Sequence, residues 1–159
     1  MDHLEFLNEY REDNRIEAKQ ATGGLPVCLW STYSAFANTL GGVILLGVVE
    51  EPDKSLRSVR LLEPEYLIRE FWEIINDPTQ VSANILSPED VSIVRSGGND
   101  IVVIFVPRAD FRHRPVYLAG DPYRNSYYRC GEGDCRLPKH EVEAMLRDRD
   151  DPHPLDGLK

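Results

Sequence analysis

The stretch YSAFANTLGGVILLGVVEE, from Tyr33 to Glu51, decides the fold, because it joins a helix, a glycine turn and a strand without a spare residue. Apolar residues recur there at three- and four-residue spacing and predict one buried helix face: Trp30, Tyr33, Phe36, Ala37 and Leu40. Proline suits a first helical turn, so the helix should begin near Pro26. It should end near Leu40, because Gly41 and Gly42 allow the left-handed backbone of a helix end.

The apolar run that follows, from Val43 to Val49, has the length of one strand. Branched residues without polar alternation are typical of a central strand that is covered on both faces. A helix packed on such a strand is an α/β unit, and the rest of the chain extends it.

The remaining patterns predict an α/β (α+β) fold, a mixed β-sheet packed by a few helices. We expect further helices at residues 4–14, 64–75 and 139–149. We expect further strands at residues 15–20, 56–62, 81–86, 91–95, 101–106, 115–118 and 125–130. The sequence SGGND between two of these strands, residues 96–100, predicts a hairpin turn.

The size and composition of the chain favour one domain. With 159 residues, of which 42% are hydrophobic, the chain is long enough for one core and short for two. We expect a domain at residues 1–148 and a tail or linker at 149–159, because the end of the chain is polar and carries two prolines. A linker there suggests that further domains follow in a longer native protein.

The location expected from the sequence is cytoplasmic and not in a membrane. No apolar run approaches membrane-spanning length, and the N-terminus MDHLEFLNEY is acidic, unlike a signal peptide. Three cysteines are too few for a disulfide framework, which agrees with a reducing compartment. Cys130, Cys135 and His140 have neither the spacing nor the fourth ligand of a zinc site.

The net charge of −9 bears on the partners of the chain. An acidic protein needs a local basic surface to bind nucleic acid. One candidate surface combines arginine with an aromatic residue, which suits phosphate contact and base stacking: Arg108, Arg112, Arg114, Arg124, Arg129 and Tyr127. The alternative is a solvated face of a β-rich region with ordinary core tyrosines.

Five blocks in order carry a family resemblance. They are Glu17–Lys19 (EAK), SAFANTLGG, ILLGV, Arg114–Tyr117 (RPVY) and Tyr127–Gly131 (YYRCG). The chain resembles the Schlafen AlbA-like domain, known in bacteria mainly as an N-terminal module of predicted transcriptional regulators. The resemblance implies an α/β domain with nucleic-acid (DNA) binding as the usual assignment.

The resemblance to animal relatives of this family implies a second possible function, that of a metal-dependent endoribonuclease. Carried over by position, its acidic residues would be Glu12, Glu17 and Glu50, with Lys19 beside Glu17 on the same strand face. Three converging carboxylates can hold Mg²⁺ or Mn²⁺, and a lysine can stabilise developing negative charge. The ordinary alternative is that these glutamates are solvated charges at the ends of elements.

Three functions therefore stay open: a nucleic-acid-binding module, a metal-dependent nuclease, and a protein-interaction or oligomerisation module. A homodimer is compatible with each of them.

Overall fold

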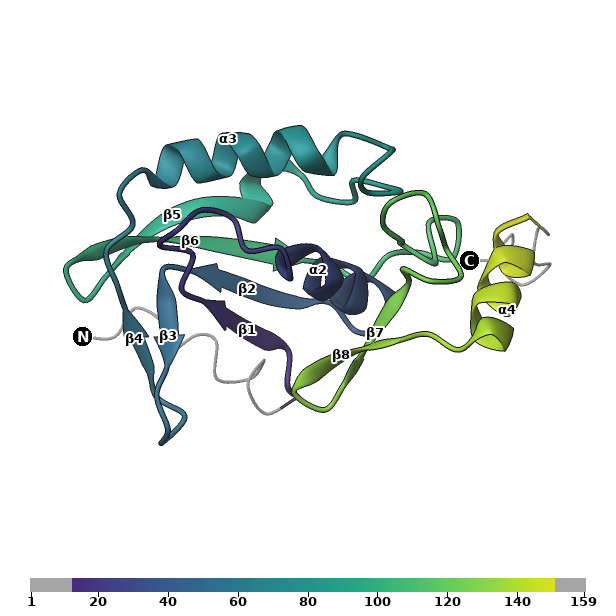
Figure 1. Cartoon of the computed structure of the whole chain (residues 1–159), viewed down its shortest axis with the longest axis horizontal. Coiled ribbons are helices and arrows are strands. Elements are labelled where there is room, and N and C mark those ends of the chain that lie inside the picture. Colours follow the sequence, from purple (N-terminus) through teal and green to yellow (C-terminus); the bar gives the residue numbers. More distant parts are fainter. Residues whose placement is uncertain (1–12, 151–159) are drawn as a thin grey trace.

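The computed structural model describes residues 13–150 and places a mixed four-stranded sheet at the centre (Figure 1). The order of its strands is β1 (Ile16–Lys19), β2 (Gly42–Leu46), β6 (Asn99–Val106) and β5 (Val91–Ser96). β1 runs parallel to β2, whereas the pairs β2–β6 and β5–β6 are antiparallel. The predicted mixed sheet with a few helices is confirmed.

The other elements form two hairpins and three helices around this sheet. The hairpins are β3 (Val48–Glu50) with β4 (Leu56–Ser58) and β7 (Tyr127–Cys130) with β8 (Gly133–Arg136). The helices are α2 (Leu29–Asn38), α3 (Pro64–Ile75) and α4 (Lys139–Asp150), and a short 3₁₀ turn, η2, covers Pro88–Asp90. In Figure 1, α3 lies above β5 and β6, and α4 lies at the end of the molecule beyond β7 and β8.

The core lies on both faces of β2, whose five residues are all buried. On one face, Ile44 and Leu46 pack with Tyr33 and Phe36 of α2 and with Phe71 of α3. Val43 and Leu45, which alternate with these residues along β2, belong to a second buried cluster on the other face, with Ile101 and Val103 of β6. The predicted double-sided burial of this strand is therefore confirmed, since alternate side chains of a strand point to opposite faces.

The helix α2 is shorter than its predicted span. It begins at Leu29, because Pro26 lies in the preceding turn, where its carbonyl accepts a hydrogen bond from the Leu29 N–H. The prediction that Leu40 is buried is wrong: the helix has already ended, and Leu40 is 56% exposed. Gly41 turns the chain with φ of +77°, and a Cβ atom there would lie 2.7 Å from the Val106 carbonyl oxygen.

Several strand predictions are wrong in part; of residues 56–62, for example, only Leu56–Ser58 form a strand. The run from Val43 to Val49 is two strands, because Gly47 has φ of +85° and directs β3 into pairing with β4. Residues 81–86 and 115–118 form isolated bridges rather than strands, one of them between Val81 and Leu118. The helix at 64–75 and the hairpin turn at 96–100 are confirmed. The predicted helix at 4–14 and the tail beyond Asp150 lie outside the described residues, except for a turn at residues 13–14.

One cysteine pair differs from the sequence-based expectation. Cys130 and Cys135 form a disulfide between β7 and β8, with their Cα atoms 5.9 Å apart. This excludes them as zinc ligands, because both sulfur atoms are bonded. None of the helices in residues 13–150 is long and apolar enough to cross a membrane.

Candidate nucleic-acid interface and acidic pocket

Glu17 and Lys19 lie on one face of β1, the edge strand of the sheet. In the register of the sheet they stand opposite Ile44 and Leu46, so they point to the face that α2 covers. The Lys19 Nζ lies 3.8 Å from a Glu17 carboxylate oxygen and donates a hydrogen bond of 3.2 Å to the Cys28 sulfur. The Lys19 side chain is only 8% exposed, so its ammonium group is held at a fixed place beside Glu17.

Arg129, on β7, reaches the same carboxylate from the opposite side. Its Nη1 lies 3.0 Å from Glu17 Oε1 and 3.0 Å from Asp134 Oδ1. Its Nε donates to the Asn14 carbonyl oxygen at 2.9 Å, and its guanidinium lies 4.9 Å from the centre of the Phe36 ring. The Arg129 side chain is only 6% exposed, so its positive charge is buried. Two carboxylates and an aromatic face stabilise that charge.

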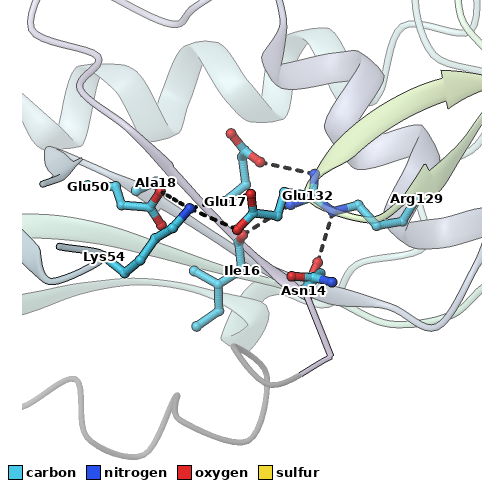
Figure 2. A pocket seen from close by; sticks show the side chains of 8 residues that line it. All are labelled: Asn14, Ile16, Glu17, Ala18, Glu50, Lys54, Arg129 and Glu132. Carbon is cyan, nitrogen blue, oxygen red and sulfur yellow. Dashed lines mark hydrogen bonds and ion pairs between the residues drawn. The ribbon is translucent and has the colours of Figure 1, made fainter. Parts of the chain in front are cut away.

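Glu17 and Arg129 border an acidic pocket with a volume of about 400 Å³, shown in Figure 2. Glu17 and Arg129 lie on one side, and Glu50, at the end of β3, contributes a second carboxylate. Across the mouth, the Lys54 Nζ lies 3.1 Å from Glu132 and 3.9 Å from Glu50. The tips of the two hairpins are thus joined by exposed ion pairs over the pocket.

Polar residues of α2 hold β7 in the position from which Arg129 enters the pocket. The Asn38 amide accepts a hydrogen bond from the Val116 N–H at 2.8 Å and donates to the carbonyls of Val116 and Tyr127, each at 3.0 Å. Ser34 Oγ donates to the Val116 carbonyl and accepts from the Tyr127 N–H. The polar side chains of the SAFANT segment, Ser34 and Asn38, therefore connect α2 to the hairpin of β7 and β8.

A second hollow, of about 170 Å³, is lined by Asn38 at the end of α2. We call it the arginine hollow, and its lining residues are Asn38, Arg108, Phe111, Arg114, Met145 and Asp148. Arg114 is held by donating from Nη1 to the Ala109 carbonyl at 2.9 Å. Burial and the neighbouring charge of Arg108 both lower the pKa of Arg114 from its usual value. The charges of Asp110 and Asp148 oppose this shift, so the hollow holds two guanidinium groups with carboxylates nearby.

The predicted basic surface is divided among several places. Arg108 and Arg114 share the arginine hollow, whereas Arg129 belongs to the acidic pocket. Arg112 is exposed and pairs with Asp110 at 3.1 Å, and Arg124 pairs with Asp121 at 3.8 Å. Tyr127 is half-buried in β7, and its main chain bonds to α2.

The predicted metal ligands are only partly brought together. Glu17 and Glu50 line one pocket, with Lys19 beside Glu17, but Glu12 lies outside the described residues. Both described carboxylates already pair with cationic side chains. Within residues 13–150, no group of three histidine, cysteine, aspartate or glutamate side chains is arranged to hold a metal ion, so these residues alone do not fit one.

Sequence reasoning missed Phe111, which lines the arginine hollow, and also Asp134 and Ser34, which hold Arg129 and β7 in place. A signal existed for Ser34, because Ser34 and Asn38 are four residues apart and so lie on the same side of a helix. No comparable pattern indicates Asp134, which meets Arg129 only through the hairpin register. Phe111 is a single aromatic residue in a loop, without a periodic pattern around it.

The comparisons with known proteins identify the family and the fold. The family model described as Schlafen, AlbA_2 matches residues 3–138. A solution structure of the N-terminal domain of a protein from Nitrosomonas europaea, provisionally described as ATP-dependent DNA helicase RecG-related, is 28% identical. It has a TM-score of 0.58, and the match covers 86% of this chain and 94% of that one.

A more distant structure shows the fold alone. The DIP2311 protein from Corynebacterium diphtheriae is 20% identical, with a TM-score of 0.57. The match covers 91% of this chain but only 26% of that protein, so the chain spans about a quarter of its length. No match was found among curated proteins.

Proposed function

Because the chain belongs to the Schlafen AlbA_2 family, we propose that it is a nucleic-acid-binding domain, and in particular the DNA-binding module of a transcriptional regulator. The 28% identical neighbour supports the general part of this proposal, since it is described as the N-terminal domain of a protein related to a DNA helicase. That description belongs to the neighbour. For this chain, nucleic-acid binding is supported by its own arginine residues.

The observation that carries the proposal is the pair Arg108 and Arg114 in one hollow. On a chain with a net charge of −9, nucleic acid needs a local concentration of positive charge. Guanidinium groups form two parallel hydrogen bonds to phosphate oxygens, so two of them at one place provide a phosphate site. The exposed Arg112 belongs to the same loop, but its charge is offset by Asp110, so the proposal rests on Arg108 and Arg114.

Binding of labelled DNA and RNA at several salt concentrations tests this function. Arg108→Ala should weaken binding and lower the slope of log K against log salt by about 0.7–0.9 for each phosphate contact that is lost. Arg95→Ala, at the tip of the β5–β6 hairpin, removes the same charge at another place and should leave the slope unchanged. Absence of binding at low salt for both DNA and RNA would overturn the proposal.

A second candidate, the metal-dependent nuclease, is favoured by one observation: Glu17 and Glu50 line the same pocket. Mg²⁺ or Mn²⁺ bound there would supply a Lewis acid, and a glutamate at position 12 would complete the predicted set. Incubation of RNA and DNA with either ion should then give cleavage that Glu17→Gln abolishes. Intact substrate with the wild-type protein would reject this candidate and leave the binding function unaffected.

A further inference from the structure

The arginine hollow is too small for a whole ligand. Its volume of about 170 Å³ is below the roughly 300–1,000 Å³ of ordinary small-molecule pockets. A hollow of this size accommodates one group of a larger molecule. Its lining combines two guanidinium groups, one phenyl ring and one carboxylate, so both charge and an aromatic face are presented to that group.

The two arginines are prepared to bind an anion. Arg108 is exposed and has neither a hydrogen bond nor an ion pair from its side chain to any residue in the range 13–150. Arg114 is oriented by its bond to the Ala109 carbonyl, and Arg149 of α4 fixes the backbone there by donating to the Arg114 carbonyl at 3.2 Å. An anion between the two guanidinium groups would relieve their mutual repulsion without moving the backbone.

Phe111 supplies an aromatic surface next to these charges. Its ring lines the hollow and is half-exposed. The Arg112 guanidinium lies 5.8 Å from the ring centre and is held in turn by Asp110 at 3.1 Å. A partly exposed ring beside two arginines suits the binding of single strands, because an unpaired base can stack on the ring while a neighbouring phosphate is neutralised.

We propose that the arginine hollow binds single-stranded nucleic acid, with one backbone phosphate between Arg108 and Arg114 and an adjoining base stacked on Phe111. This inference rests on the proposed nucleic-acid-binding function and specifies its substrate, because bases in an intact duplex are not available for stacking. Asp148 lines the same hollow, and its negative charge repels a phosphate. Removal of this charge should therefore strengthen binding, whereas loss of an arginine should weaken it.

The experiment compares a fluorescent single strand of roughly twelve nucleotides with its duplex, as DNA and as RNA, by anisotropy at low salt. The single strand should bind more tightly. Phe111→Ala should weaken its binding roughly tenfold and leave duplex binding unchanged, whereas Phe111→Tyr should keep the single-strand affinity. Circular dichroism confirms that each variant is folded.

Substitution of Asp148 gives a second, independent measurement. Asp148→Asn should tighten single-strand binding by about two- to fivefold, because a negative charge near the phosphate is removed. The control Glu65→Gln removes the same charge in the first turn of α3, which lies far from α4 in Figure 1, and should have no such effect. The two variants have equal net charge but alter different helices, α3 and α4.

The outcomes separate this inference from the function on which it rests. Binding that is weakened by Arg108→Ala but unaffected by Phe111→Ala and Asp148→Asn would overturn the single-strand site and preserve the nucleic-acid-binding function. Equal affinity for the single strand and the duplex would do the same. Absence of binding to every oligonucleotide would overturn both.

Discussion

Arg129 and Glu17 connect the C-terminal hairpin to the edge strand of the sheet through a contact of 3.0 Å between Nη1 and Oε1. The two residues come from β7 and β1, which are more than a hundred positions apart in the sequence. Since Arg129 also contacts Asp134 of β8, both strands of the hairpin depend on this guanidinium. The acidic pocket therefore exists only in the folded arrangement of these elements.

Replacement of Arg129 by alanine should lower the free energy of unfolding by about 3 kcal/mol, because two carboxylates, one of them largely buried, lose their arginine partner. This is the lower end of the usual range, since Glu17 keeps a 27% exposed side chain and regains some hydration. Urea denaturation measures the change. Arg124→Ala is the control: Arg124 is 85% exposed, and its loss should change stability by less than about 0.5 kcal/mol.

Asn38→Asp tests the bridge between α2 and the hairpin without changing the size of the side chain. An aspartate can still accept from the Val116 N–H, but it cannot donate to the carbonyls of Val116 and Tyr127. We expect a loss of about 2–3 kcal/mol of unfolding free energy, because buried polar groups lose their partners. Ser31→Ala on the exposed side of the same helix should lose far less. Equal losses would contradict the bridging role of Asn38.

The sequence was sufficient for the elements whose pattern is local. The prediction that Glu17 and Lys19 share a face of β1 is confirmed, and the spacing of Tyr33 and Phe36 correctly predicted the buried side of α2. The roles of Asn38 were not predictable in this way, because its bonding partner Val116 lies 78 positions away. A local sequence pattern indicates which side chains are buried, whereas the hydrogen-bond partner of a polar side chain depends on the tertiary fold.

The strand break at Gly47 was missed for a related reason. Hydrophobic periodicity is continuous through this position, so the run from Val43 to Val49 resembles one strand. The positive φ of Gly47 and the close approach of the Leu61 side chain, 2.8 Å from a Cβ atom placed there, are tertiary features. The break matters for the pocket, because it directs β3 and hence Glu50 to its edge.

Tyr33→Phe should change the alkaline stability of the protein. Burial raises the pKa of the Tyr33 hydroxyl well above its usual value of about 10, while the Ile85 N–H that bonds to it opposes the shift. A raised folded-state pKa stabilises the fold fully below the unfolded pKa, and this contribution is lost as the pH rises from there toward the folded pKa. Wild-type stability should therefore fall above about pH 10, and Tyr33→Phe should remove part of that fall.

The measurement for Tyr33 is the free energy of unfolding between neutral and alkaline pH. At neutral pH, Tyr33→Phe should cost about 1–3 kcal/mol, because the Ala83 carbonyl and the Ile85 N–H lose their partner. Tyr66→Phe, on the exposed face of α3, should keep both the neutral stability and the alkaline fall. An alkaline fall that is identical in wild type and Tyr33→Phe would refute the assignment.

The ion pair between Lys54 and Glu132 should hold the mouth of the acidic pocket only weakly. Both side chains are mostly exposed, so water and salt screen the 3.1 Å contact, and Glu50 competes for the same ammonium group at 3.9 Å. A double-mutant cycle with Lys54→Met and Glu132→Gln should give a coupling energy below about 1 kcal/mol that decreases further in 1 M salt. Such a value means that this ion pair contributes little to holding the two hairpin tips together. A coupling of several kcal/mol that salt does not reduce would contradict the expectation of a weak, solvent-screened contact.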